Sequence, residues 1–164
     1  MKTNLLALIF AMLLLRIISP TQAQPAMKVP RIGFLLAGGS PETARRDAFR
    51  QGLRELGHVE GKNIVIEYRY AEGKVERIPD LAAELVRLKV DVIVTSGGER
   101  TILAAKKASA TIPIVFAGAG DPVGTGLVSS LARPGGNITG LSTMTPDLDG
   151  KRLELLKEAF PKVA

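Results

Sequence analysis

Short apolar runs alternate with amphipathic segments along most of this chain. Residues 32–36, 90–95 and 113–116 are apolar without alternation, which is typical of parallel strands that helices cover on both faces. Residues 64–70 differ, because isoleucine and tyrosine side chains at every second position alternate with valine, glutamate and arginine. This period of two predicts a strand with one more exposed face, at an edge of the sheet.

Helical spacing of apolar residues fills the stretches between these strands. It predicts helices over 44–56, 78–86 and 102–108, with Gly57 as the stop signal of the first. A shorter helix is predicted through Leu127, Val128 and Leu131. Alternating strands and helices indicate an α/β fold, an open parallel sheet with right-handed crossovers and a strand order of about 2-1-3-4-5.

The last twenty residues predict one more helix. Thr145 supplies an N-cap and Pro146 suits the first helical position. Leucine, alanine and phenylalanine side chains then form an apolar face that runs up to Pro161. We expect the domain to occupy residues 31–144 and this helix, within 145–164, to lead away from it.

The N-terminus has the pattern of a secretory signal peptide. Lys2 precedes an unbroken apolar run over residues 5–15, and small residues precede a cleavage site near Ala23. A membrane-spanning helix needs about 20 apolar residues, and Arg16 interrupts this run. We expect residues 1–23 to be removed, residues 24–30 to be disordered and the mature protein to be periplasmic or extracytoplasmic.

Composition excludes several classes of function. The 164 residues contain no cysteine, which removes disulfides, thiolate metal sites and cysteine nucleophiles. The formal net charge of +6 is spread over several helix faces, and aromatic residues make up 4%, so we expect no nucleic-acid partner. His58 is the single histidine and lies in a polar turn, which gives neither a metal site nor a catalytic triad. We therefore expect no enzyme activity, no metal and no cofactor.

Glycine and hydroxyl residues follow the predicted strands. In an open parallel sheet the carboxyl ends of the strands and the N-termini of several helices meet in one crevice, where free N–H groups suit a carboxylate. Glycines let a ligand approach the backbone closely. The candidate ligand-binding residues are Gly39, Ser40, Ser96, Gly97, Gly98, Gly120, Asp121 and Thr143.

Two of these candidates have a second interpretation. Ser40 precedes Pro41 and Asp121 precedes Pro122, which is the order of an N-cap followed by a proline at the first helical position. The Asp121 carboxylate either caps its own helix or faces the ammonium group of a ligand. Asparagine at this position separates the two hypotheses, because a cap survives that change and a charge partner does not.

Several segments together resemble one family. They are IGFLLAGGSP from residue 32, AFRQGLRELGHVEGKNIVIEYRYAEG from 48, LAAELVRLKVDVIVTSGG from 81, TIPIVFAGAGDPVGTGLVSSLARPGGNITGL from 111 and GKRLELLKEAFPKV from 150. From about Arg31 to its last residue the chain is similar to the tryptophan/tyrosine-type substrate-binding proteins of ABC transporters, which have the type I periplasmic-binding-protein fold. A departure occurs at SGGER (96–100), where many members have a Gly-Thr-Pro-like turn.

The resemblance implies a function for the protein and a second lobe in addition to the one seen in this sequence. It implies capture of an amino-acid-like, aromatic small molecule between two lobes, with delivery to ABC permease and ATPase subunits and membrane contact only through the permease. It also implies that a second lobe follows Ala164, so we expect this chain to be a fragment that holds the first lobe. Because hinge closure around the solute needs both lobes, we expect the lone lobe to bind weakly or not at all.

Two other functions stay open at this point. A ligand-sensing domain of a signalling protein uses the same lobe for detection, and only neighbouring sequence separates it from a transport protein. A nucleotide-dependent Rossmann-type enzyme is less compatible with the residues. The loop at 37–42 lacks the G-x-G-x-x-G spacing, and the second strand ends in Tyr70 where an acidic residue is needed for the ribose.

Overall fold

The computed structural model describes residues 28–39, 44–143 and 145–161, without the side chains of 145–147. The predicted signal peptide, residues 1–23, therefore lies outside the described residues. Five strands form one sheet in the order β2-β1-β3-β4-β5, and every neighbouring pair is parallel. This confirms the predicted α/β fold and its strand order.

The strands are β1 (Arg31–Leu36), β2 (Val65–Tyr70), β3 (Val92–Ser96), β4 (Ile114–Ala119) and β5 (Ile138–Ser142). The helices are α2 (Ala44–Glu55), α3 (Ile78–Arg87), α4 (Glu99–Ala108) and α5 (Thr145–Ala159), with a short 3₁₀ turn η2 (Val75–Arg77) before α3. The predicted helices at 44–56, 78–86 and 102–108 are thus confirmed, and β2 lies at an edge as expected.

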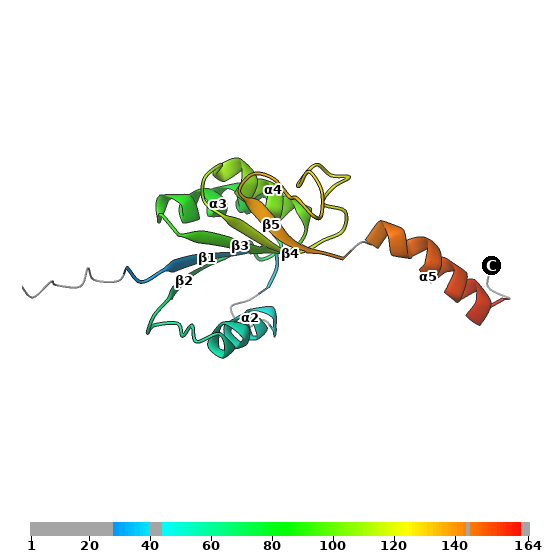
Figure 1. The fold of residues 1–164 in the computed structure, drawn as a ribbon, viewed down its shortest axis with the longest axis horizontal. Coiled ribbons are helices and arrows are strands. Elements are labelled where there is room, and N and C mark those ends of the chain that lie inside the picture. Colours follow the sequence, from blue (N-terminus) through cyan, green and yellow to red (C-terminus); the bar gives the residue numbers. More distant parts are fainter. Residues whose placement is uncertain (1–27, 40–43, 144, 162–164) are drawn as a thin grey trace, which may run out of the picture.

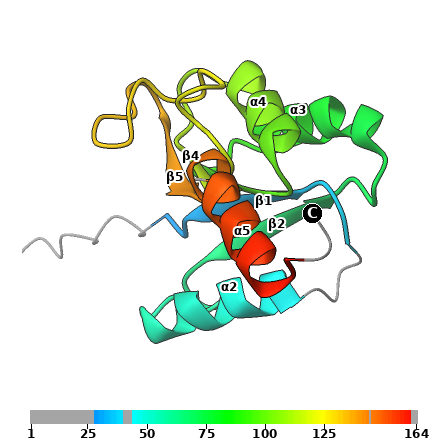
Figure 2. The ribbon, with the colours of Figure 1, turned by 90° about the vertical axis from the view of Figure 1, so that its right-hand side faces the viewer.

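Helices α3 and α4 lie on one face of the sheet and α2 lies on the other (Figure 1). Figure 2 shows the same arrangement from the side where β5 leads into α5. The larger core lies between the sheet and the α3–α4 pair, where each buried aliphatic side chain contributes about 1.5–3 kcal/mol. Its fully or nearly fully buried members include Leu35, Ile78, Leu85, Ile93, Ile102, Ile114 and Phe116.

The opposite face is covered over β1 and β2 and open over β4 and β5. Phe34 packs there with the half-buried Phe49 of α2. Along β4, buried and exposed positions alternate; Val115 is 38% exposed, and Leu141 of β5 is 73% exposed. The prediction that helices cover both faces of the strand at 113–116 is therefore wrong, because α2 is the one described helix on this face and it does not reach β4.

The short helix predicted through Leu127, Val128 and Leu131 is also wrong. Residues 121–131 form turns and bends without a helix. Gly126 has φ 69°, a left-handed conformation that interrupts any helix. Leu127 and Val128 are both buried although they are adjacent, whereas Leu131 is exposed, so the apolar residues fill the core from a loop instead of from one helix face.

The first helix ends where the sequence predicted. Gly57 has φ 83°, and its N–H donates to the Arg54 carbonyl at 2.9 Å. The His58 N–H donates to the Leu53 carbonyl at 2.8 Å. These two bonds form a Schellman motif, which a glycine in the left-handed conformation closes at low cost.

Residues 28–30 precede β1 and belong to the stretch expected to be disordered. The Pro30 carbonyl accepts a hydrogen bond from the Val65 N–H at 2.9 Å, which extends the β1–β2 pairing by one bond. Lys28 forms an ion pair with Asp91. The Lys28 ammonium, together with the Arg31 backbone N–H, holds the pKa of the Asp91 carboxyl below its usual value.

Helix α5 projects from the lobe beyond β5 (Figure 1, Figure 2). All of its described side chains are exposed, and among them are Leu148, Leu153, Leu155 and Leu156. An isolated helix of this length is marginal in water, since helices in proteins gain most of their stability from packing. None of the described helices is long and apolar enough to cross a membrane.

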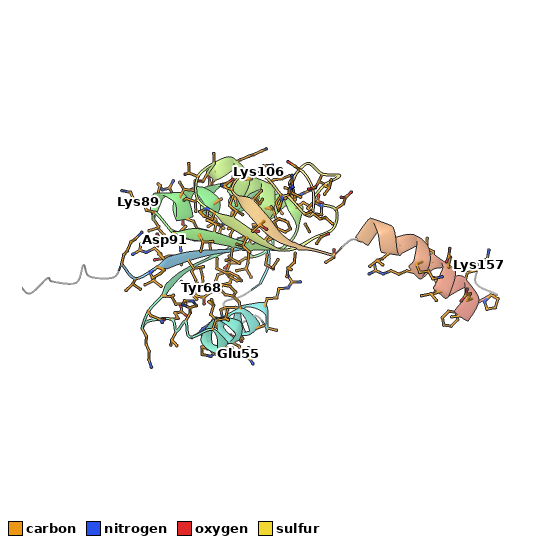
Figure 3. The ribbon with its side chains drawn as sticks, in the orientation of Figure 1. Glu55, Tyr68, Lys89, Asp91, Lys106 and Lys157 are labelled. Carbon is orange, nitrogen blue, oxygen red and sulfur yellow. The ribbon has the colours of Figure 1, made fainter. Side chains whose placement is uncertain are left out.

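Tyr68 lies in the layer between the sheet and α2 (Figure 3). Its ring packs edge-on against Phe34 with centroids 5.9 Å apart and stacks on Tyr70. Its hydroxyl donates to the Glu60 carboxylate at 3.4 Å. Burial, and then the negative charge of Glu60, raise the pKa of Tyr68 from 10.0 to about 12.

This raised pKa predicts an alkaline loss of stability. Because the folded protein holds the Tyr68 proton more tightly than the unfolded chain, this contribution is fully present below pH 10 and is lost as the pH rises through about 12. The chain has two tyrosines, so Tyr70→Phe leaves Tyr68 as the single one. Its tyrosinate absorbance is expected to titrate near pH 12, and a midpoint near 10 contradicts the packing described here. The variant Tyr68→Phe is expected to flatten the alkaline part of the stability profile.

Candidate functional site

Loops from four strands meet at the carboxyl edge of the sheet. The Ala37 N–H, after β1, donates to the Ser96 carbonyl at the end of β3 at 3.2 Å. The Thr143 N–H, after β5, donates to the Ala119 carbonyl at the end of β4 at 2.8 Å, and the Thr143 hydroxyl donates to the same carbonyl at 3.2 Å. These bonds join the loops in pairs, so the edge that the sequence predicted as a crevice is held by backbone contacts.

A cavity of about 690 Å³ opens at this edge and runs along the face of the sheet that α2 leaves uncovered. We call it the rim cavity. Its polar part consists of Ser96, Gly97, Gly98, Gly118 and Thr143. Its apolar part consists of Phe34, Val94 and Ala117 from the sheet. Helix α2 contributes Arg45, Ala48 and Phe49.

The structure separates the candidate residues into two groups. Four of them line the rim cavity together: Ser96, Gly97, Gly98 and Thr143. Three lie in the neighbouring loops without lining it: Gly39, Gly120 and Asp121. Ser40 lies outside the described residues. The candidate residues that line the cavity thus come from the end of β3, the loop between β3 and α4 and the residue after β5.

Helix α4 points its N-terminus at the rim cavity. Its N-cap is Gly98, and no side chain caps the helix there. The N–H groups of Thr101 and Ile102 donate to the Gly98 carbonyl at 3.2 and 3.5 Å. The N–H groups of Glu99 and Arg100 occupy the first two helical positions, which have no partner within a helix, and they are the donors that α4 offers to an oxygen in the cavity. Gly97 and Gly98 have φ 122° and 91°, and these values favour glycine and bring the bare backbone to the cavity wall.

The wall beside the sheet is apolar and aromatic. Phe34 is 3% exposed, and its ring stacks on that of Phe49 with centroids 4.8 Å apart. Such a surface suits the body of an apolar or aromatic ligand. With polar groups at the rim and aromatic rings below, the cavity is amphipathic along its length.

Sequence reasoning missed the contribution of α2. Arg45, Ala48 and Phe49 line the cavity and share one face of the helix, because residues three and four apart are neighbours there. Their spacing was visible in the sequence. What the sequence did not show is that α2 leaves β4 open, since that depends on how one helix is placed across the sheet.

Asp121 acts as a cap in the structure. Its Oδ1 accepts a hydrogen bond from the Gly124 N–H at 2.7 Å, and its backbone carbonyl accepts from the Thr125 N–H at 3.1 Å and the Thr125 hydroxyl at 2.6 Å. The carboxylate therefore closes a turn, although no helix follows it. This geometry favours the capping hypothesis over a contact with a ligand ammonium group.

Capping predicts different results for two substitutions. Asp121→Asn keeps an oxygen acceptor for the Gly124 N–H, so the melting temperature and ligand affinity are expected to stay close to those of the parent chain. Asp121→Ala removes the acceptor and is expected to cost about 1 kcal/mol of stability. Thermal unfolding of both variants checks this. If Asn lowered ligand affinity strongly while leaving the melting temperature unchanged, Asp121 would be a charge partner of the ligand.

Comparisons with known proteins match this lobe. A family model described as "ABC transporter substrate binding protein" matches residues 37–164. A curated tyrosine-binding protein of Clostridioides difficile (strain R20291) is 35% identical over 117 residues, which cover 71% of this chain and 33% of that protein.

Three solved structures share the fold. A conserved domain protein of Vibrio cholerae has a TM-score of 0.71 at 36% identity, and the matched region covers 82% of this chain and 45% of that protein. An open, ligand-free substrate binding protein of Clostridium difficile with adhesive properties has a TM-score of 0.65 at 31% identity, covering 82% and 45%. An ABC domain of Streptococcus pneumoniae in complex with L-Trp has a TM-score of 0.59 at 25% identity, covering 69% and 38%. This chain therefore spans less than half the length of each relative.

Proposed function

This chain belongs to the ABC transporter substrate binding protein family, and from this membership and the rim cavity we propose that it is a solute-binding lobe of an extracytoplasmic receptor. The receptor captures a small amino-acid-like molecule and delivers it, chemically unchanged, to an ABC permease with its ATPase. The observation that carries the proposal is the rim cavity itself, which lies at the carboxyl edge of a parallel sheet, where such folds bind ligands.

The lining residues support binding over catalysis. The hydroxyl groups that line the rim cavity belong to Ser96 and Thr143. Thr143 already donates its hydroxyl proton to the Ala119 carbonyl. Neither hydroxyl has a histidine, lysine or carboxylate beside it among the residues that line the cavity, and an activated nucleophile needs such a base within hydrogen-bonding distance. The lining is therefore suited to hold a solute with backbone N–H groups and hydroxyls.

Two observations favour an aromatic amino acid as the solute. The matched relatives include a tyrosine-binding protein and a domain in complex with L-Trp. In this chain the half-buried Phe49 and Val94 and the exposed Ala117 provide apolar surface for an aromatic side chain, and Phe49 is backed by the buried Phe34 ring. The free N–H groups at the start of α4 provide donors for a carboxylate. We propose tyrosine or tryptophan as the class of solute.

We propose that the rim cavity is one wall of a two-walled site. The relatives are more than twice as long as the part that this chain matches, and α5 exposes its leucines beyond β5. In such a receptor the solute contacts both walls and stabilises their closed arrangement. One wall alone supplies part of these contacts, so this chain is expected to bind its solute weakly.

Export directed by an N-terminal signal peptide completes the proposal. Lys2, the apolar run at 5–15 and the small residues before Ala23 support cleavage of a signal peptide near Ala23. The mature protein then works outside the cytoplasm and reaches the membrane through the permease. Mass spectrometry of the exported protein is expected to find an N-terminus close to residue 24, and an intact Met1 in the exported protein contradicts this part of the proposal.

The binding proposal is tested by titrating the chain with L-tryptophan, L-tyrosine, L-leucine and L-lysine in a calorimeter. Weak binding of the two aromatic amino acids, with the others weaker still, is the expected result. Chromatography of the solution afterwards is expected to recover each solute unchanged. Conversion of a solute into a product, or a clear preference for lysine over both aromatic amino acids, contradicts the proposal.

A further inference from the structure

We infer that Arg45 binds the carboxylate of the solute in the rim cavity and makes the site selective for solutes that carry a carboxylate. This inference rests on the proposed function and adds a specificity-determining residue to it. Arg45 lies in the first turn of α2, on the helix face that also carries Ala48 and Phe49 along the cavity. Arg45 is exposed to solvent and lines the cavity together with these two residues.

The other arginines nearby on α2 are occupied. Arg46 forms an ion pair with Asp47 at 3.0 Å, and this hydrogen-bonded carboxylate raises the pKa of Arg46. Arg50 forms an ion pair with Glu60 at 3.0 Å, and neither residue lines the rim cavity. Arg45 has no carboxylate partner among the described residues, so its guanidinium is available to a ligand.

Arg45 is also the one charged side chain among the residues that line the rim cavity. A guanidinium presents a planar fork of donors that matches a carboxylate with two parallel hydrogen bonds. The N-terminus of α4, which Gly98 leaves without a side-chain cap, adds a second positive feature at the same opening. Two positive features and an apolar wall in one cavity fit a solute with one carboxylate and one apolar body.

A pair of simple probes isolates this contact. 3-Phenylpropionate carries a carboxylate and an aromatic body, whereas 3-phenylpropan-1-ol has the same body without the charge. The chain is titrated with each probe while the amide signals of Ser96, Gly97, Gly98 and Thr143 are followed by NMR. We expect the carboxylate probe to bind more tightly than the alcohol.

The variant Arg45→Gln is expected to weaken binding of the carboxylate probe roughly fivefold, the scale of a partly exposed charge-assisted hydrogen bond. Its affinity for the alcohol is expected to stay the same. Arg45→Lys is expected to be intermediate, because it keeps the charge and loses the fork. The control is Arg54→Gln, which removes the same charge from the same helix at a position that does not line the cavity, and its affinities are expected to match those of the parent chain.

Each outcome decides the inference. Equal affinities of Arg45→Gln and the parent chain for the carboxylate probe overturn it, as does a parent chain that binds the alcohol as tightly as the acid or shows no shift with the acid. An equal loss in Arg54→Gln also overturns it, since the effect is then one of net charge. If the Arg45-dependent preference is found and L-tryptophan does not bind, the assignment of the solute fails while the role of Arg45 stands.

Discussion

Replacing Gly97 by alanine is expected to destabilise the lobe by about 3 kcal/mol and to abolish binding in the rim cavity. A Cβ at this position would lie 2.5 Å from the Ala37 Cβ and 2.9 Å from the Ala37 nitrogen, so the loops after β1 and β3 would have to move apart. The glycine also has φ 122°, which adds strain for any other residue. Overpacking and backbone strain of this kind each cost about 1–3 kcal/mol.

Thermal unfolding and titration with L-tryptophan measure the two effects of Gly97→Ala. The matched control is Gly57→Ala at the end of α2, where φ is 83° and a Cβ would meet nothing within 4 Å. That control carries the backbone strain alone and is expected to cost about 1 kcal/mol without changing ligand affinity. If Gly97→Ala were no less stable than the control and bound the solute normally, the close approach of the two loops would have no role in the site.

Gly140→Ala is expected to destabilise the sheet by about 2–3 kcal/mol without touching the rim cavity directly. Gly140 pairs with Phe116 in the β4–β5 register. A Cβ there would lie 2.5 Å from the Phe116 ring and would also overlap the Phe116 carbonyl oxygen. Because Phe116 is buried in the core, neither the ring nor the backbone can yield without loss of packing or of the β5 pairing.

Gly52→Ala is the matched control for Gly140→Ala. Gly52 lies within α2, and a Cβ there would meet nothing within 4 Å. Alanine is a better helix former than glycine by roughly 1 kcal/mol, so this control is expected to raise the melting temperature. Chemical denaturation of both variants checks the opposite signs, and a stability gain in Gly140→Ala would show that β5 is not held in the register described here.

The sheet could be predicted from the sequence because each buried strand has a local pattern of apolar residues. The apolar run at 32–36 forms the interior strand β1, which is covered on both faces. Gly57 marks the end of α2 because a left-handed residue is needed there. The turns at 121–131 were misjudged for a tertiary reason. Leu127 and Val128 resemble the start of an amphipathic helix, yet both enter the core from a loop that Asp121 and Gly126 shape.

Part of the candidate site could also be predicted, where a local sequence pattern indicates the role of a residue. Gly97 and Gly98 could be selected from the sequence, because glycines after a parallel strand combine close approach with a helix N-terminus. Phe34 and Arg45 could not be selected as site residues from the sequence. Their place beside the rim cavity depends on the position of α2 across the sheet, and that position is set by packing against Phe34, which sequence spacing does not encode.

The central claim is that a solute binds at the carboxyl edge of the sheet without being altered. Its most direct test is an NMR titration of the isotope-labelled chain with L-tryptophan. We expect the largest amide shifts at Ser96, Gly97, Gly98 and Thr143, with no shift in the separate groove between α3 and α4 that includes Ala83 and Ala108. Shifts confined to that groove, or none at the rim, would contradict the account.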